Sequence, residues 1–160
     1  ETEPKSTYDW SSYKWCNGND RELTKYCAKS SYGYNGFTDD KATLEMSGDA
    51  AYINMGSKWR MPTGSEFEEL IDNCTWTWTT RDGVNGYKVR GTNGNSIFFP
   101  AAGYYFNSDL CDVCTDGFYW SSSLCENFQN RGSCLEFDSD KFNHYSHYRG
   151  IGCAVRAVVR

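Results

Sequence analysis

The chain has 160 residues, enough for one domain with a hydrophobic core, and its formal net charge is -5. Because it contains no basic run, electrostatics give nucleic-acid binding no support. No apolar run approaches the length that spans a bilayer, so we expect no direct insertion into a membrane.

The cysteine content points to an oxidising compartment. Eight cysteines suit disulfides in an exported protein, although their pairing cannot be deduced from the sequence. Cys111 and Cys114 form the one CxxC pair, and the only histidines, His144 and His147, lie far along the chain. A zinc site is therefore disfavoured, and a thioredoxin-like role lacks its βαβ context. We expect a mature or trimmed exported protein with some cysteine pairs closed, no metal and no cofactor.

Residues 1–38 are polar and rich in turn formers and aromatic side chains. We expect a long loop region with little regular structure, held in place by its aromatics and by Cys16 and Cys27. Residues 39–57 predict a short helix, with Ser47 as its cap and Gly56 at its exit. Tyr52 and Met55 are expected to face inward.

A second helix is predicted over 63–73. Pro62 biases the preceding residue away from helical angles, and Thr63 with Glu66 has the spacing of a capping box. Arg60 is expected to make a semi-buried bond, with Glu66 as one partner. The apolar stripe of this helix consists of Phe67, Leu70, Ile71 and Cys74.

After Cys74 the hydrophobic period changes to two, which predicts strands. Trp76 and Trp78 share one face of a strand over 75–80. Turns are predicted at 82–83 and 85–86, and a hairpin connection at 92–95. Further strands are expected over 87–90, 96–99, 118–122, 135–137 and 154–159, with a loop over 106–117 and no clear period over 138–150.

Two helices followed by many short strands predict an α+β domain with small mixed or antiparallel sheets. The expected core consists of Trp59, Phe67, Leu70, Trp76, Trp78, Phe98, Trp120 and Val155.

Several motifs, in this order, resemble those of the Fibrobacter succinogenes major paralogous domain. They are YKWCNG, LTKYC, DDKATLE, GDAAYINMGSKWRMPTGSEFEELIDNCTWTWTT, GVNGYKV, NGNSIFFPAAGY, YWSSS and the terminal VRAVV. That family is abundant in exported proteins of gut Bacteroidetes, and its fold is similar to the C-type lectin fold. The resemblance implies a single C-type lectin-like domain over 1–160 that lacks the family's N-terminal strand region. Either the chain was clipped, or it is a fragment whose terminal strand over 154–159 has lost its partner, and an unpaired edge would need covering.

Relatives with C-type lectin-like folds include variable proteins of diversity-generating retroelements, in which adenine-containing codons are mutagenised. Segment 123–153 resembles such a diversified region. The resemblance implies a fixed scaffold of Tyr119, Trp120, Ser121, Ser122, Leu135, Phe137, Ser139, Arg149, Gly152, Val155 and Arg156. Ala157, His144 and Gly150 depart from the family pattern, which leaves loop detail open.

The residues between these scaffold positions are diverse, mostly polar and aromatic, as in a paratope. The candidate ligand-binding residues are Glu126, Asn127, Phe128, Gln129, Asn130, Glu136, Asp138, Lys141, His144, Tyr145, Ser146, His147 and Tyr148.

Two other chemistries are disfavoured. The Glu-Pro-Asn, Gln-Pro-Asp and Trp-Asn-Asp motifs of calcium-dependent sugar binding do not occur, so Glu136, Asp138 and Asp140 are expected to be solvated carboxylates. Formylglycine-generating enzymes share the Arg-x-Pro-Thr helix start, but their cysteine pair has no counterpart here. We expect no enzyme activity, and His144 is expected to be an exposed loop residue.

The expected function is therefore ligand binding, by an adhesin or receptor-binding domain at the cell surface or outside the cell. The partner would be a cell-surface protein recognised through the 123–153 face. The alternative is a calcium-independent carbohydrate-binding module that uses the same face for a glycan.

Overall fold

The structure is a computed structural model that describes residues 2–160. It has an α+β fold in which short strands form several small sheets, as predicted. The helices are α1 (Ala50–Met55) and α2 (Gly64–Asn73), with 3-10 turns η1 (Ser30–Tyr32), η2 (Tyr34–Gly36) and η3 (Met46–Gly48). The strands are β1 (Trp59–Arg60), β2 (Thr75–Arg81), β3 (Val84–Arg90), β4 (Ser96–Pro100), β5 (Tyr104–Phe106), β6 (Asp109–Cys111), β7 (Gly117–Leu124), β8 (Arg131–Phe137), β9 (Phe142–Tyr148), β10 (Gly152–Cys153) and β11 (Val158–Val159).

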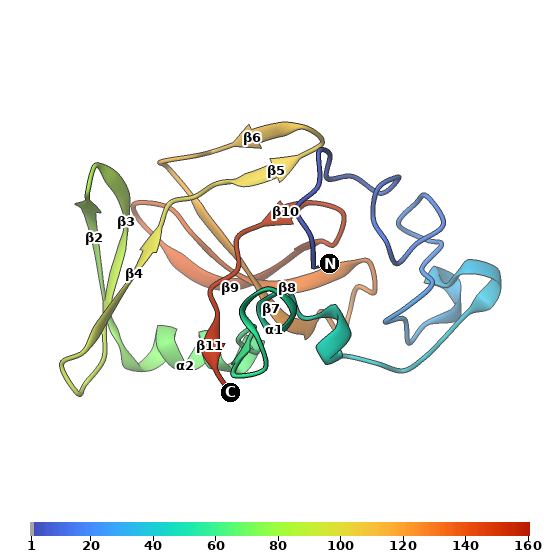
Figure 1. Ribbon diagram of the computed structural model, residues 1–160, viewed down its shortest axis with the longest axis horizontal. Helices are drawn as coiled ribbons and strands as arrows, with labels where there is room; N and C mark the ends of the chain where they lie inside the picture. Colours follow the sequence, from blue (N-terminus) through green and yellow to red (C-terminus); the bar gives the residue numbers. More distant parts are fainter. Residues whose placement is uncertain (1) are drawn as a thin grey trace.

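The sheet β7-β8-β9 lies in the middle of the molecule, and the other parts surround it (Figure 1). The sheet β2-β3-β4 forms one end, and the loops of the first 45 residues form the other. The β5–β6 hairpin pairs with β10, and α2 packs against β7, β8 and β9. All pairs between these named strands are antiparallel.

The start of α2 follows the predicted capping box. The Thr63 side chain accepts a bond from the Glu66 amide at 3.2 Å, and the Glu66 carboxylate accepts one from the Thr63 amide at 2.8 Å. The Arg60 guanidinium donates to both Glu66 oxygens at 2.6 Å, which confirms the expected partner. These bonds satisfy amides that a helix start would otherwise leave unpaired.

The prediction for α1 was wrong in two respects. Its cap is Asp49, not Ser47, because the Asp49 carboxylate accepts from the Tyr52 amide and also from the Met61 amide. Asp49 thereby ties the helix to the strand that follows it. Met55 is 53% exposed rather than inward, whereas Gly56 ends the helix at φ 94° as predicted.

The β2–β3 hairpin contains one predicted turn and lacks the other. Asp82 and Gly83 both have positive φ and form its two-residue connection. The predicted turn at Asn85 and Gly86 was wrong, because both residues lie in β3 and pair with β2. A Cβ at Gly86 would lie 2.1 Å from the Phe99 carbonyl oxygen, so close strand approach explains this glycine.

Regular structure also extends beyond the predicted strands. The expected loop over 106–117 contains β6, and the segment over 138–150 contains β9. Within the expected strand over 154–159 only β11 is a named strand, because β10 ends at Cys153, before that segment begins. Because β11 pairs with β1, the terminal strand has a partner, contrary to the expectation of an unpaired edge.

The main core lies between α2 and the sheets β2-β3-β4 and β7-β8-β9. Trp76 stacks on Phe99 and Phe142 at centroid distances of 5.9 and 4.5 Å. Four residues of the predicted core were misplaced: Phe99 rather than Phe98 is buried, Trp59 and Trp120 are partly exposed and lie outside the main cluster, and Val155 is 38% exposed. The buried cluster is Phe67, Tyr87, Val89, Phe99, Ala101, Tyr119, Leu135 and Phe137.

The N-terminal loops have little regular structure, as predicted, and they are held by residues far along the chain. The Arg149 guanidinium donates to the Tyr26 and Lys25 carbonyls at 2.9 and 3.3 Å. Leu23, Tyr26 and Cys27 are fully buried. Within residues 2–160 no cysteine pair forms a disulfide, so the expected closed pairs are absent from this structure.

Candidate functional site

The candidate residues lie on the β7–β8 loop, on β8, on the turn between β8 and β9, and on β9. Strand β8 is the central strand of its sheet and is mostly buried, whereas β9 is an edge strand. The candidate side chains therefore sit on a rigid support. The structure does not gather them into one surface, because all of them except Tyr148 divide into four groups with different surroundings.

The first group is the tip of the β7–β8 loop. Glu126, Asn127 and Phe128 are exposed there, Phe128 by 50%. Gln129 and Asn130 were also predicted as ligand-binding residues, and they are only 8% and 7% exposed. The Gln129 side chain accepts from the Ala28 amide at 2.6 Å, and Asn130 donates to the Asp20 carboxylate at 2.7 Å. These two residues therefore hold the N-terminal loops.

The second group faces α2. His144 was expected in an exposed loop, but it lies in β9 with 22% of its side chain exposed. Its Nδ1 is 2.8 Å from the Glu68 carboxylate, and its Nε2 is hydrogen-bonded to the Ser133 hydroxyl. Ser146 lies further along the same face of β9, beside Ser133.

The Ser133, His144 and Glu68 side chains follow the order of a nucleophile, a base and an orienting acid. However, Ser133 is 5% exposed, and a Cβ at Gly64 would lie 2.8 Å from its hydroxyl oxygen. The start of α2 therefore covers this hydroxyl. The arrangement links the helix to the sheet and leaves no room for a substrate carbonyl at Ser133.

The third group lies on the opposite face of the sheet. His147 Nε2 is 2.7 Å from the Glu136 carboxylate, and its ring packs edge-on against Phe118. Cys134 lies on the same face and is fully buried, and burial raises the pKa of its thiol. Tyr145, opposite Cys134 in the ladder, is 49% exposed.

The fourth group is the turn between β8 and β9. The Asp138 carboxylate accepts from the Asp140 and Lys141 amides at 2.8 and 3.1 Å, and these bonds lower its pKa. This turn is separated from the loop tip by the length of β9, about 20 Å for a strand of this size. Asp138 and Lys141 therefore shape a distant turn and do not share a surface with Phe128.

An arginine that the sequence reasoning missed joins the loop tip to β9. Arg131 Cζ lies over the Phe128 ring at 5.3 Å and over the Tyr148 ring at 4.8 Å. Tyr148 is 46% exposed and also meets Trp10 edge-on. We call Phe128, Arg131, Tyr148 and Trp10 the stacked-arginine cluster. The signal that could have identified Arg131 is its pairing with Tyr148 between β8 and β9. This pairing depends on the register of β9, which the sequence did not reveal.

Neither the acidic residues nor the cysteines form a metal site in the described part of the chain. No group of three or more His, Cys, Asp or Glu side chains within residues 2–160 has a geometry that could hold an ion.

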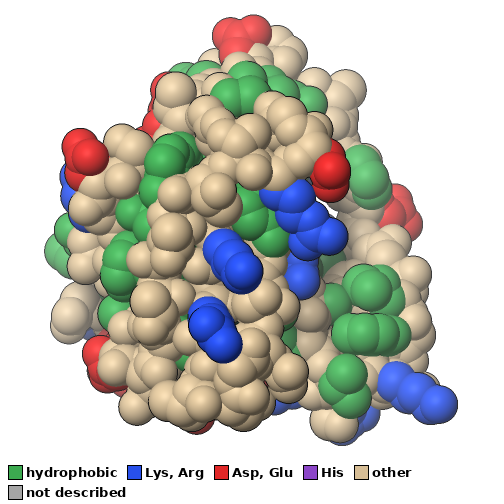
Figure 2. Space-filling model, turned by 90° about the vertical axis from the view of Figure 1, so that its left-hand side faces the viewer, with side chains coloured by type: hydrophobic (Ala, Val, Ile, Leu, Met, Phe, Trp, Pro, Cys, Tyr) green, Lys and Arg blue, Asp and Glu red, His purple; other side chains and the backbone are tan. Residues whose placement is uncertain are grey.

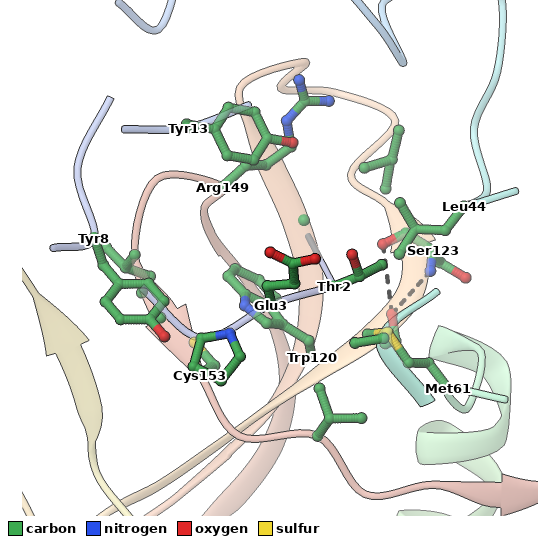
Figure 3. Close-up of a pocket in the computed structure, with 18 of the residues that line it drawn as sticks. Thr2, Glu3, Tyr8, Tyr13, Leu44, Met61, Trp120, Ser123, Arg149 and Cys153 are labelled. Carbon is green, nitrogen blue, oxygen red and sulfur yellow. Dashed lines mark hydrogen bonds between the residues drawn. The ribbon is translucent and has the colours of Figure 1, made fainter. Parts of the chain in front are cut away.

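Two pockets lie away from these groups. The first has a volume of about 310 Å³ and is lined by Trp120, Tyr8 and Met61 among others. Figure 3 shows Trp120 between Tyr8 and Cys153 on one side and Leu44, Ser123 and Met61 on the other, with Thr2 and Glu3 across it. The second, of about 550 Å³, lies between α2 and β11 and is lined by Trp59, Leu70 and Val158.

The outer face of β2 and β3 is basic. Arg81, Lys88 and Arg90 are exposed there beside a row of threonines. Figure 2 shows this end of the molecule, with Lys and Arg side chains near its centre and hydrophobic side chains beside them. Arg81 has a nearby carboxylate, that of Asp82 at 3.6 Å.

No protein-family model, curated protein or solved structure matches this chain. No helix within residues 2–160 is long and apolar enough to cross a membrane. The resemblance described above therefore rests on the sequence motifs.

Proposed function

We propose that this protein is a non-catalytic ligand-binding domain, an adhesin or receptor-binding module of an exported protein, with the C-type lectin-like fold of the Fibrobacter succinogenes major paralogous domain. Its partner would be a cell-surface protein. The binding surface would be the loop tip with the exposed part of β9, a smaller area than the whole of 123–153.

One observation carries this proposal: exposed aromatic rings stand on a rigid support. Phe128 is 50% exposed at the loop tip, Tyr148 is 46% exposed at the end of β9, and Tyr145 is 49% exposed on the other face of β9. Large, stiff, amphipathic side chains are the usual anchors of recognition surfaces, because ordering them on binding costs little entropy. The neighbouring β8 is buried, so these rings are presented in a fixed arrangement.

We further propose that this surface is diversified as in variable proteins of retroelements. The test is deep sequencing of the coding region for residues 118–156 across many cells of the source population. Variation at adenine-containing codons such as that of Asn127, with Trp120, Gly152 and Arg156 constant, would support the proposal. A uniform sequence would remove diversification and leave a fixed binding module.

A calcium-independent carbohydrate-binding module is the alternative. The same exposed rings favour it, since aromatic faces stack on sugar rings. A glycan array and competition by free sugar separate the two. Binding to a cell-surface protein that free sugar fails to displace supports protein recognition, and displacement supports the alternative.

A further inference from the structure

The stacked-arginine cluster holds a guanidinium in a fixed position at the exposed loop tip. The Phe128 and Tyr148 rings lie against Arg131 at 5.3 and 4.8 Å, and Arg131 Nη1 donates to the Ser146 carbonyl at 3.3 Å. Aromatic stacking and this bond restrict the side chain before any ligand arrives. Less entropy is therefore lost when the guanidinium forms further hydrogen bonds.

The remaining donors of Arg131 are available. Within residues 2–160, neither its Nε nor its Nη2 has a hydrogen-bond partner, and no carboxylate pairs with the guanidinium. An arginine fork with two parallel N–H groups matches the two oxygens of a carboxylate. A second cation lies nearby, since Lys29 Nζ donates to the Asn127 carbonyl beside Phe128 at 3.2 Å.

The shape of the surroundings indicates the kind of ligand. The aromatic neighbours of Arg131 are about half exposed, Phe128 by 50% and Tyr148 by 46%, so the site is open to solvent. Sites for small molecules and sugars are usually concave, whereas protein interfaces are flatter and enriched in arginine and aromatic anchors.

We propose that Arg131 is a specificity-determining binding residue that receives the carboxylate of an aspartate or glutamate side chain on the protein ligand. This inference rests on the proposed binding function and adds the chemical class that the surface prefers, an acidic segment.

The experiment is a titration of the ¹⁵N-labelled protein followed by NMR at the Arg131 Nε–H resonance. The probes are the peptide acetyl-Gly-Glu-Gly-Glu-Gly-amide and its Gln counterpart, with N-acetylneuraminic acid as a sugar acid. We expect saturable shifts with the Glu peptide, in the millimolar range, and at least about fivefold weaker binding of the Gln peptide.

Two variants of Arg131 separate the effect of its positive charge from that of its forked guanidinium geometry. Arg131→Met should abolish the shifts that the Glu peptide causes at neighbouring amides. Arg131→Lys, which keeps the charge and loses the fork, should weaken binding about threefold or more. Arg90→Met removes an exposed arginine on the outer face of β3 and should leave the peptide affinity unchanged. Thermal unfolding of each variant confirms that it folds.

The outcomes are distinct. Equal affinity for the Glu and Gln peptides, or unchanged binding in Arg131→Met, would overturn the carboxylate site. Binding of the sugar acid without binding of the peptide would overturn the acidic protein segment. A uniform coding sequence together with peptide binding at Arg131 would remove diversification and leave this inference standing.

Discussion

At the scale of single residues, Glu66 has the most closely defined electrostatic environment. Hydrogen bonds from Arg60, and then from the Thr63 backbone, lower the pKa of its carboxyl from 4.5 to about 2. A carboxylate whose pKa is depressed on folding stabilises the native state above its unfolded pKa. That contribution is lost as the pH falls from about 4.5 through about 2.

We therefore expect Glu66→Gln to lower the free energy of unfolding by about 0.5–1 kcal/mol at pH 7, a modest value because 36% of the side chain is exposed. The difference from the wild type should shrink below pH 4.5. Urea unfolding at pH 7 and pH 3 measures both values. Glu69→Gln on the exposed side of α2 is the control, and an equal effect at both pH values would contradict the ion pair.

Two asparagines of the β7–β8 loop should respond differently to the same substitution. Asn130 is 7% exposed and donates to Asp20, so Asn130→Ala should cost about 1–3 kcal/mol. Asn127 is exposed, and Asn127→Ala should change stability by less than about 0.5 kcal/mol. Chemical denaturation of the two variants gives the comparison. Similar values would show that Asn130 does not anchor the N-terminal loops.

At the scale of elements, the close approach of β3 and β4 gives the sharpest test. An added Cβ at Gly86 would clash with the Phe99 carbonyl, so Gly86→Ala should destabilise by about 1–3 kcal/mol. Val84→Ala in the same strand alters an exposed side chain and should stay within about 0.5 kcal/mol. If thermal unfolding ranks these two variants in the reverse order, the β3–β4 register is wrong.

Sequence patterns predicted the elements whose signals are local. The α2 capping box and the alternating tryptophans of β2 depend on residues within one turn or one strand. Strand β9 was missed because its two faces meet different surroundings: His144 faces α2, while His147 faces Phe118. No hydrophobic period of two can arise from such a strand.

The distinction between local and long-range signals also applies to the candidate residues: side-chain type is visible in the sequence, whereas distant contacts are not. The exposed Phe128, Tyr145 and Tyr148 could be chosen by residue type alone. The structural roles of Gln129 and Asn130 could not, because their partners lie more than 100 positions earlier in the chain. Arg131 also required the strand register, since its stacking partner Tyr148 belongs to the neighbouring strand.

At the scale of the whole molecule, cysteine reactivity reports the fold. Cys114 is exposed, whereas Cys27 and Cys134 are fully buried, and burial raises the pKa of both buried thiols. Only the thiolate reacts with iodoacetamide. In the reduced protein we expect rapid alkylation of Cys114 and protection of Cys27 and Cys134 until unfolding, as measured by peptide mass spectrometry. Equally rapid labelling of Cys134 in the native protein would contradict the placement of β8.

The contacts that hold the N-terminal loops have a consequence for synthesis. The hydrogen bond of the Tyr26 carbonyl needs Arg149, and that of the Ala28 amide needs Gln129. The ribosome adds these partners 123 and 101 positions later. At about 5–20 residues per second, the first part of the chain remains without its anchors for about 5–25 s. Leu23, Tyr26 and Cys27, which are all buried in the finished fold, lie in the segment that these contacts hold. A chaperone or protease that acts on the nascent chain would therefore meet this segment before its anchors have formed.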